Sequence, residues 1–132
     1  MFYVTVLGSG ATLPTLKRAT TSVAVQREGD IFLFDCGEGT QLQWLKAGLR
    51  RGKLRAICIS HTHGDHVNGL VGFLQTLGLH GRERPLTLVG PPGMEDIIKC
   101  AEKTVGLRTP FRLEIIESTG GSVIEMGGCT VS

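Results

Sequence analysis

Six consecutive residues near the middle of the chain carry four side chains that could bind a metal ion. They read His61-Thr62-His63-Gly64-Asp65-His66 and follow an apolar run at positions 54–60. Neutral imidazole nitrogens and carboxylate oxygens are the ligands that zinc and similar divalent transition metals prefer. Because alternate residues of an extended segment point the same way, His61 and His63 can bind one ion together.

The last two residues of this segment, Asp65 and His66, are adjacent at the predicted start of the next helix and could bind a second ion. Two ions about 3.5–4 Å apart are the usual arrangement for holding the attacking and leaving oxygens of phosphate ester hydrolysis. A single histidine is more often an ordinary polar residue, but four potential ligands in six residues predict a metal centre. His80, the remaining histidine, has no ligand-type neighbours and is predicted to lie on the surface.

Composition limits the class of protein. A chain of 132 residues fits one domain with a buried core, and we expect residues 1–132 to form a single unit without a linker. The net charge of +2 permits a nucleic-acid partner without demanding one.

The four cysteines are widely spaced, which favours free thiols in a reducing compartment. The N-terminus has no basic leader, and no apolar run reaches the roughly 20 residues that cross a bilayer, so we expect a cytoplasmic protein without membrane contact.

Hydrophobic periodicity predicts strands first and then alternating strands and helices, which indicates an α/β layered fold. We expect strands at 2–7, 22–26, 31–35, 54–60, 86–89, 113–116, 123–126 and 129–132, and helices at 38–47, 67–79 and 94–105. The consecutive apolar residues 56–59 are typical of a strand that is covered on both faces. Since three helices cannot easily cover two faces, we expect a bare apolar face that pairs with another copy or with the rest of a longer polypeptide.

The segment at 61–66 resembles the H-x-H-x-D-H signature of the metallo-β-lactamase superfamily. The residues around it resemble the ribonuclease Z branch, the endonucleases that trim the 3′ end of precursor tRNA. The segments that carry this resemblance are Leu7-Gly8-Ser9-Gly10, Pro14-Thr15 with Arg18, Phe34-Asp35-Cys36-Gly37-Glu38-Gly39-Thr40-Gln41, and residues 86–91. The resemblance implies a metallo-β-lactamase-type αβ/βα sandwich, of which this chain supplies about one half as a mixed sheet with helices on one face.

For the site, the resemblance implies that His61 and His63 bind one zinc ion and that Asp65 and His66 bind the second. It also makes Asp65 the proton acceptor that helps to generate the attacking hydroxide, which fits the lowered pKa of metal-bound water. Asp35 either orients the histidine segment by accepting an imidazole N–H or only ends a strand and accepts backbone amides. The implied activity is hydrolysis that removes the 3′ trailer of precursor tRNA. The alternatives are another hydrolase of the superfamily, acting on a small phosphodiester, sulfate ester, lactam or thioester, and a non-catalytic half-domain.

Two features depart from the family pattern. The family's substrate loop carries a Lys, an Arg and an Asn, of which only the Arg is matched, by Arg18, because Leu16 and Ala19 occupy the positions of the Lys and the Asn. The remaining metal ligands of the family lie in a C-terminal half, so we expect this chain alone to bind metal weakly and to be a poor catalyst. It is expected to form a homodimer or to associate with that missing half. The basic run at 50–55 could attract RNA phosphates, although a solvated loop is the simpler interpretation.

Overall fold

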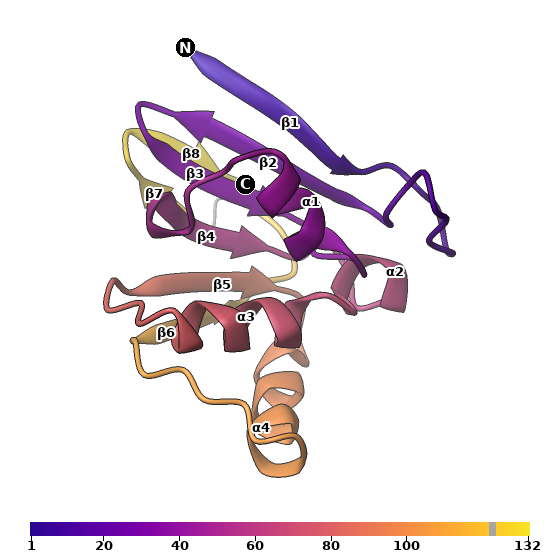
Figure 1. The fold of residues 1–132 in the computed structure, drawn as a ribbon. Helices are drawn as coiled ribbons and strands as arrows, with labels where there is room; N and C mark the ends of the chain where they lie inside the picture. Colours follow the sequence, from indigo (N-terminus) through magenta and orange to yellow (C-terminus); the bar gives the residue numbers. More distant parts are fainter. Residues whose placement is uncertain (122–123) are drawn as a thin grey trace.

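The computed structural model describes residues 1–121 and 124–132 and contains one six-stranded sheet, a separate two-stranded hairpin and helices (Figure 1). The sheet consists of β1 (Phe2–Gly8), β2 (Ser22–Arg27), β3 (Asp30–Phe34), β4 (Leu54–Cys58), β5 (Leu86–Gly90) and β6 (Leu113–Glu117), and the hairpin of β7 (Ile124–Met126) and β8 (Cys129–Val131). The helices are α1 (Thr40–Lys46), α2 (Gly64–Val67), α3 (Leu70–Leu79) and α4 (Met94–Thr104), with a 3-10 turn, η1 (Arg51–Lys53). Within the described residues, no helix is long and apolar enough to cross a membrane.

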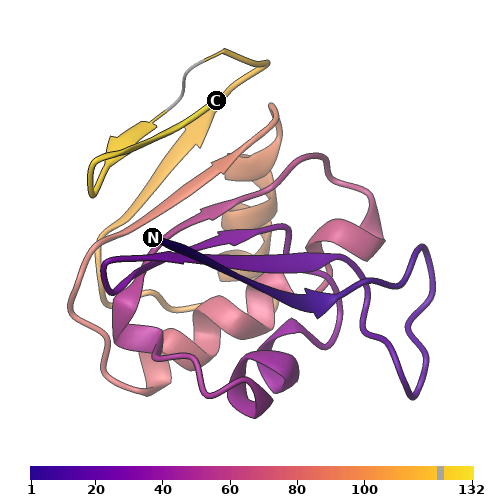
Figure 2. The ribbon, with the colours of Figure 1, turned by 90° about the horizontal axis from the view of Figure 1, so that it is seen from above.

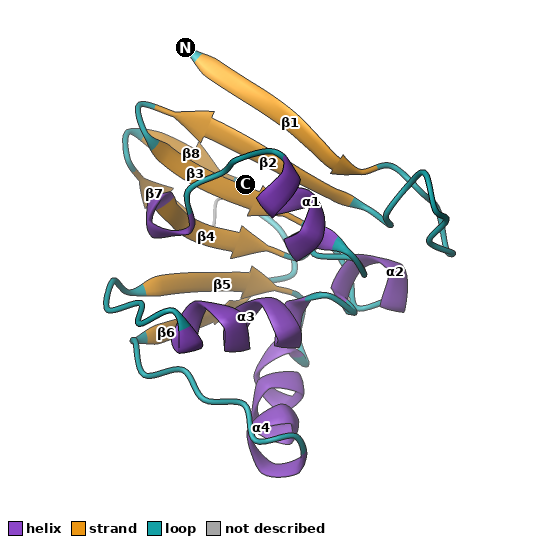
Figure 3. Ribbon diagram, viewed as in Figure 1, coloured by secondary structure: helices purple, strands orange, loops and turns teal. Residues whose placement is uncertain are grey.

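The sheet is mixed, and its strands follow one another in chain order from β1 to β6. The β1–β2 and β2–β3 pairs are antiparallel, whereas β3, β4, β5 and β6 run parallel (Figure 3). A two-residue turn joins β2 to β3, and its residues Glu28 and Gly29 have φ values of 50° and 86°, as the favoured hairpin turns require. Because the carboxyl ends of parallel strands meet at one edge, Asp35 and the loop after β4 are brought together there.

One face of the sheet is covered by helices, as the sequence predicts. Trp44 of α1 and Phe73 of α3 are fully buried, with ring centroids 5.3 Å apart, and Ile98 of α4 extends the same core. The strands contribute alternate residues such as Leu33 and Ile57 to this face. In the view from above, α1, α3 and α4 lie on the same side of the sheet (Figure 2). This confirms the predicted α/β fold with a mixed sheet and helices on one face.

The opposite face differs from the sequence expectation. The prediction of a bare apolar face is wrong for the centre of the sheet, because the β7–β8 hairpin packs there. Ile124 and Val131 of the hairpin belong to a second core cluster with Phe32 and Cys58. The predicted strand at 123–126 begins at Ile124 in the structure, and Val123 lies outside the described residues. At the β1 end, apolar side chains stay exposed: the exposed fractions are 60% for Phe2, 65% for Val4 and 62% for Val6.

The predicted helix at 67–79 is wrong in one respect, because the structure divides this region into α2 and α3. The amide of Gly69, between the two helices, donates to the carbonyl of Cys36 at 2.9 Å. A Cβ atom on Gly69 would lie 2.2 Å from the carbonyl oxygen of Gly37. The close passage of the segment at 36–37 therefore interrupts the helix and requires glycine at position 69. The other predicted boundaries agree with the structure to within about two residues.

We expect Gly69→Ala to lower the free energy of unfolding by about 2 kcal/mol, because the added methyl group forces two backbone segments apart. Gly72→Ala is the matched control within α3, where the nearest atom to a new Cβ is a side-chain nitrogen 4.0 Å away. That change should raise stability by about 0.5–1 kcal/mol, since alanine favours a helix interior over glycine. Urea denaturation followed by circular dichroism measures both, and equal effects would contradict the proposed backbone contact.

Candidate metal centre

The four predicted ligands lie in the loop after β4 and in the first turn of α2, at the carboxyl edge of the parallel strands. The ring of His61 stands between the other two imidazoles. Its centroid is 4.0 Å from that of His66 and 4.8 Å from that of His63. Oδ2 of Asp65 lies 3.4 Å from Nε2 of His66. The structure thus brings all four predicted ligands together at one end of the sheet.

The chemistry of these donors fits a zinc-type ion, because three imidazoles and one carboxylate adjoin. The coordination geometry that these donors supply is incomplete. Among the residues that the structure describes, no three histidine, cysteine, aspartate or glutamate side chains converge closely enough to hold a metal ion. The cluster therefore supplies a set of adjacent donors and not a closed coordination sphere.

Asp35 links the end of β3 to the histidine loop. Its carboxylate accepts hydrogen bonds from the amide of Ser60 at 2.7 Å, from the Ser60 hydroxyl at 2.9 Å and from Nδ1 of His66 at 2.8 Å. Asp35 is buried and has a left-handed backbone with φ of 58°, a conformation that aspartate tolerates better than most residues. The sequence left two roles open for Asp35, and the structure contains the contact that belongs to each. One contact is to an imidazole and the other is to a backbone amide.

These contacts fix which imidazole nitrogens can face an ion. Because the Asp35 carboxylate can only accept, Nδ1 of His66 carries the hydrogen, and in the neutral imidazole this leaves the lone pair on Nε2. The Ser60 hydroxyl donates to Asp35 and lies 3.0 Å from Nδ1 of His61, so it accepts from that nitrogen. Nε2 of His61 is then free as well. One buried carboxylate, acting directly and through Ser60, therefore sets both rings in the tautomer that binds metal through Nε2.

Asp65 receives a contact from the loop between β1 and β2. The Thr12 amide donates to Oδ2 of Asp65 at 3.1 Å, and Thr12 has a left-handed backbone with φ of 65°. This hydrogen bond is the main cause that holds the pKa of Asp65 below its ordinary value, and the electrostatic influence of the neighbouring His66 and His61 side chains acts in the same direction. The Asp65 carboxylate is consequently ionised at neutral pH, as a metal ligand must be.

Arg18, the predicted substrate-binding residue, lies on the same loop, beside a hollow that none of the imidazoles lines. Its side chain is exposed and lines a hollow of about 160 Å³ together with Lys17 and Gln43. Its backbone amide donates to the hydroxyl oxygen of Thr15 at 3.0 Å. Thr12 is therefore the residue of this loop that contacts the predicted ligands.

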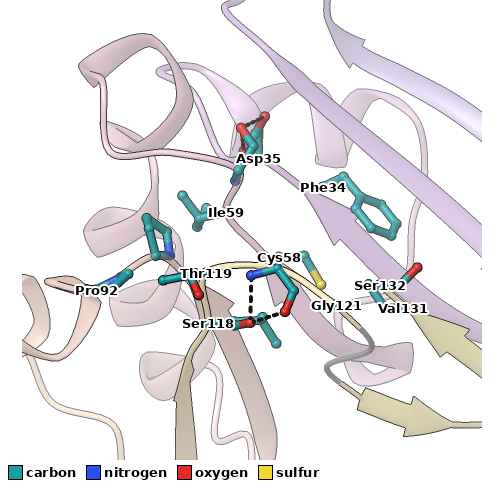
Figure 4. A pocket seen from close by; sticks show the side chains of 15 residues that line it. Phe34, Asp35, Cys58, Ile59, Pro92, Ser118, Thr119, Gly121, Val131 and Ser132 are labelled. Carbon is teal, nitrogen blue, oxygen red and sulfur yellow. Dashed lines mark hydrogen bonds between the residues drawn. The ribbon is translucent and has the colours of Figure 1, made fainter.

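A pocket of about 570 Å³ adjoins the cluster and shares Asp35 and Ser60 with it (Figure 4). Phe34 and Cys58 lie on its sheet side, and the turn at 118–121 lies on its other side. Its volume falls within the range of about 300–1,000 Å³ for small-molecule sites. An apolar hollow therefore opens directly beside the hydrogen-bonded carboxylate.

The cysteines do not add ligands to the cluster. All four are free in the structure, as the sequence predicts. Burial raises the pKa of Cys36 and of Cys58 to about 12, so both thiols stay protonated at neutral pH. A protonated thiol is a poor metal ligand.

Two residues of this network escaped the sequence analysis. Ser60 directly precedes His61, and its position at the end of a buried strand is the signal that could have identified it. Thr12 contacts Asp65 across 53 positions of the chain, and no local pattern marks such a contact.

Solved structures with the same arrangement define the class of protein. A metallo-β-lactamase fold protein from Bacillus subtilis superimposes with a TM-score of 0.74 at 24% identity, covering 96% of this chain and 48% of that chain. The short form of human tRNase Z superimposes with a TM-score of 0.81 at 39% identity, covering 89% of this chain and 44% of that chain. The chain therefore has the metallo-β-lactamase fold, of which it contributes about one half.

Sequence comparison then gives the family. Residues 2–102 match the family described as Anti-Pycsar protein Apyc1, and the chain belongs to this family. Ribonuclease Z from Methanothermobacter thermautotrophicus is 43% identical over 125 residues, which are 95% of this chain and 41% of that relative. The resemblance to ribonuclease Z is thus confirmed. The chain spans about two-fifths of the length of this curated relative.

Proposed function

We propose that this chain is the N-terminal half of a zinc-dependent endoribonuclease that hydrolyses a phosphodiester to remove the 3′ trailer from precursor tRNA, and that it carries part of the metal site. The observation that carries the proposal is the Asp35 network, which leaves Nε2 of both His61 and His66 free at one edge of the sheet. The likeness to proteins named ribonuclease Z and tRNase Z supports RNA as the substrate.

In this proposal, His61 and His63 hold one zinc ion, and Asp65 and His66 hold a second. Zinc supplies a water molecule of lowered pKa and charge for the ester oxygens. Asp65 would accept or direct a proton of the attacking water, and its ionised state at neutral pH suits this role. Asp35 and Ser60 orient the imidazoles, and Arg18 contributes a cation for the phosphates of the RNA 3′ end.

We further propose that residues 1–132 form one half of a metallo-β-lactamase domain and are completed by association. The incomplete convergence of the donors and the uncovered side chains of β1 support this proposal. The covering partner is either the portion of the enzyme that corresponds to the unmatched part of the relatives or a second copy of this chain. Ligands from that partner would close the coordination sphere.

Complementation tests this function. The chain is mixed with Zn²⁺, a precursor tRNA transcript and the part of the Methanothermobacter ribonuclease Z that the chain does not match. We expect release of the intact 3′ trailer from the mixture and little cleavage by either component alone, with gel electrophoresis as the measurement.

The Asp65→Asn variant is the control for this experiment, because it keeps the size of the side chain and removes the proton acceptor. It should abolish trailer release. If the mixture hydrolyses small phosphodiesters or thioesters and leaves RNA intact, the ribonuclease assignment is wrong and the broader hydrolase assignment replaces it.

A further inference from the structure

A cationic region lies at the opposite end of the sheet from the histidine cluster. Two adjoining hollows, of about 470 and 260 Å³, share Arg51, Gly52 and His80 in their walls. We call them together the basic groove. Its cationic side chains come from the turn before β4 and the loop before β5, namely Arg50, Arg51, Arg82 and Arg84. The only acidic residue among those that line the two hollows is Glu83.

The cations of the basic groove are only partly neutralised. Asp30 pairs with Arg55 at 3.2 Å and with Arg84 at 3.5 Å. Among the described residues, the guanidinium groups of Arg50 and Arg51 have no hydrogen-bond or ion-pair partner. Burial, followed by repulsion from Arg84 and Arg55, lowers the pKa of Arg82 to about 10. Positive charge is therefore in excess here, although the net charge of the whole chain is only +2.

Arg82 holds the backbone on both sides of the basic groove in a fixed arrangement. The residue is 9% exposed, and its guanidinium donates to the carbonyls of Arg51 at 3.1 Å, Leu54 at 2.7 Å and Pro85 at 2.9 Å. These bonds tie the turn before β4 to the loop before β5. Because the backbone on both sides is held, the groove needs no rearrangement before it binds an anion.

The shape of the groove favours phosphates. A Cβ atom added to Gly48, Gly52 or Gly81 would meet nothing within 4 Å, so the floor is open to close approach. Guanidinium groups bind phosphate oxygens in pairs, and two adjoining hollows suit successive phosphates of one strand.

We propose that the basic groove is a second RNA-binding surface, which holds the phosphate backbone of a substrate remote from the cleaved bond. This inference rests on the proposed function. The strand β4 and the residues after it connect Leu54 beside the groove to His61 at the metal cluster. At about 3.3 Å per residue these seven steps span roughly 20 Å. Only an extended or folded RNA can contact both places, so the groove adds affinity for long substrates.

The test measures binding without hydrolysis. Fluorescence anisotropy of a fluorescein-labelled precursor tRNA is recorded with the chain in EDTA over a series of NaCl concentrations. The Arg50→Gln/Arg51→Gln variant should bind about 10-fold more weakly at 0.1 M NaCl. The slope of log affinity against log salt concentration should become smaller by about 1–2. Circular dichroism verifies that the variant is folded, which is expected because neither side chain is fully buried.

The Lys103→Gln/Arg108→Gln variant is the matched control, since it removes the same charge from exposed positions outside the groove. Equal losses in both variants would show that only net charge matters and would overturn the proposal. Tighter binding of polyglutamate than of RNA would overturn it in favour of an acidic protein partner. Because the assay excludes metal, its outcome is separate from that of the cleavage experiment.

Discussion

Replacement of Asp35 by alanine is expected to lower the free energy of unfolding by about 2–3 kcal/mol and the zinc affinity by about 10–100-fold. The stability loss follows because the Ser60 amide and Nδ1 of His66 both lose their acceptor. The loss of affinity follows because His61 and His66 can then turn or change tautomer. Urea denaturation measures the first effect, and competition with a zinc-binding dye measures the second.

Two further variants separate the contributions of Asp35. Asp35→Gly also removes the carboxylate but accepts the left-handed backbone, so it should be more stable than Asp35→Ala by about 1 kcal/mol. Asp30→Ala is the control for loss of a paired carboxylate nearer the surface. It should lower the free energy of unfolding by about 0–1 kcal/mol. Zinc affinity that is unchanged in Asp35→Ala would contradict the positioning role of this residue.

His63→Ala is expected to reduce zinc binding by at least about 100-fold, a larger loss than that from a residue that only orients a ligand. His63 is exposed and contributes little packing, so the free energy of unfolding should change by less than about 0.5 kcal/mol. Zinc stoichiometry after dialysis, measured by atomic absorption, tests the ligand assignment independently of any activity.

The control for His63→Ala is His80→Ala, because His80 is also exposed and lies in the basic groove and not in the metal cluster. That variant should retain the zinc content of the wild type. If His63→Ala binds as much zinc as His80→Ala, the assignment of His63 as a ligand is wrong.

Local patterns in the sequence were sufficient to predict the elements of the fold. The amphipathic spacing of Met94, Ile98 and Ala101 predicts α4 because a helix buries one stripe, and these three residues are buried. The break between α2 and α3 was not predictable in the same way. It depends on the contact of Gly69 with a segment more than 30 positions away, which leaves the apolar stripe of the sequence intact.

The same distinction between local patterns and contacts of distant segments applies to the candidate site. His61, His63, Asp65 and His66 are recognisable because metal ligands of these types seldom lie so close together by chance. The sequence left two roles open for Asp35 because the partners of a buried carboxylate depend on how β3 and β4 pair. Thr12 was missed because a backbone amide has no side-chain signature. The cover of the central sheet by β7 and β8 was missed because the sequence does not specify where a late hairpin folds back.

The exposed strand β1 has a consequence for the behaviour of this chain in solution. It lies at one end of the sheet, so no strand among the described residues adjoins its outer backbone amides and carbonyls. The segment Phe2-Tyr3-Val4-Thr5-Val6-Leu7 carries no charge and no proline, and short uncharged segments of high β-propensity stack readily into fibrils. A partner that shields β1 would therefore protect the polypeptide against aggregation.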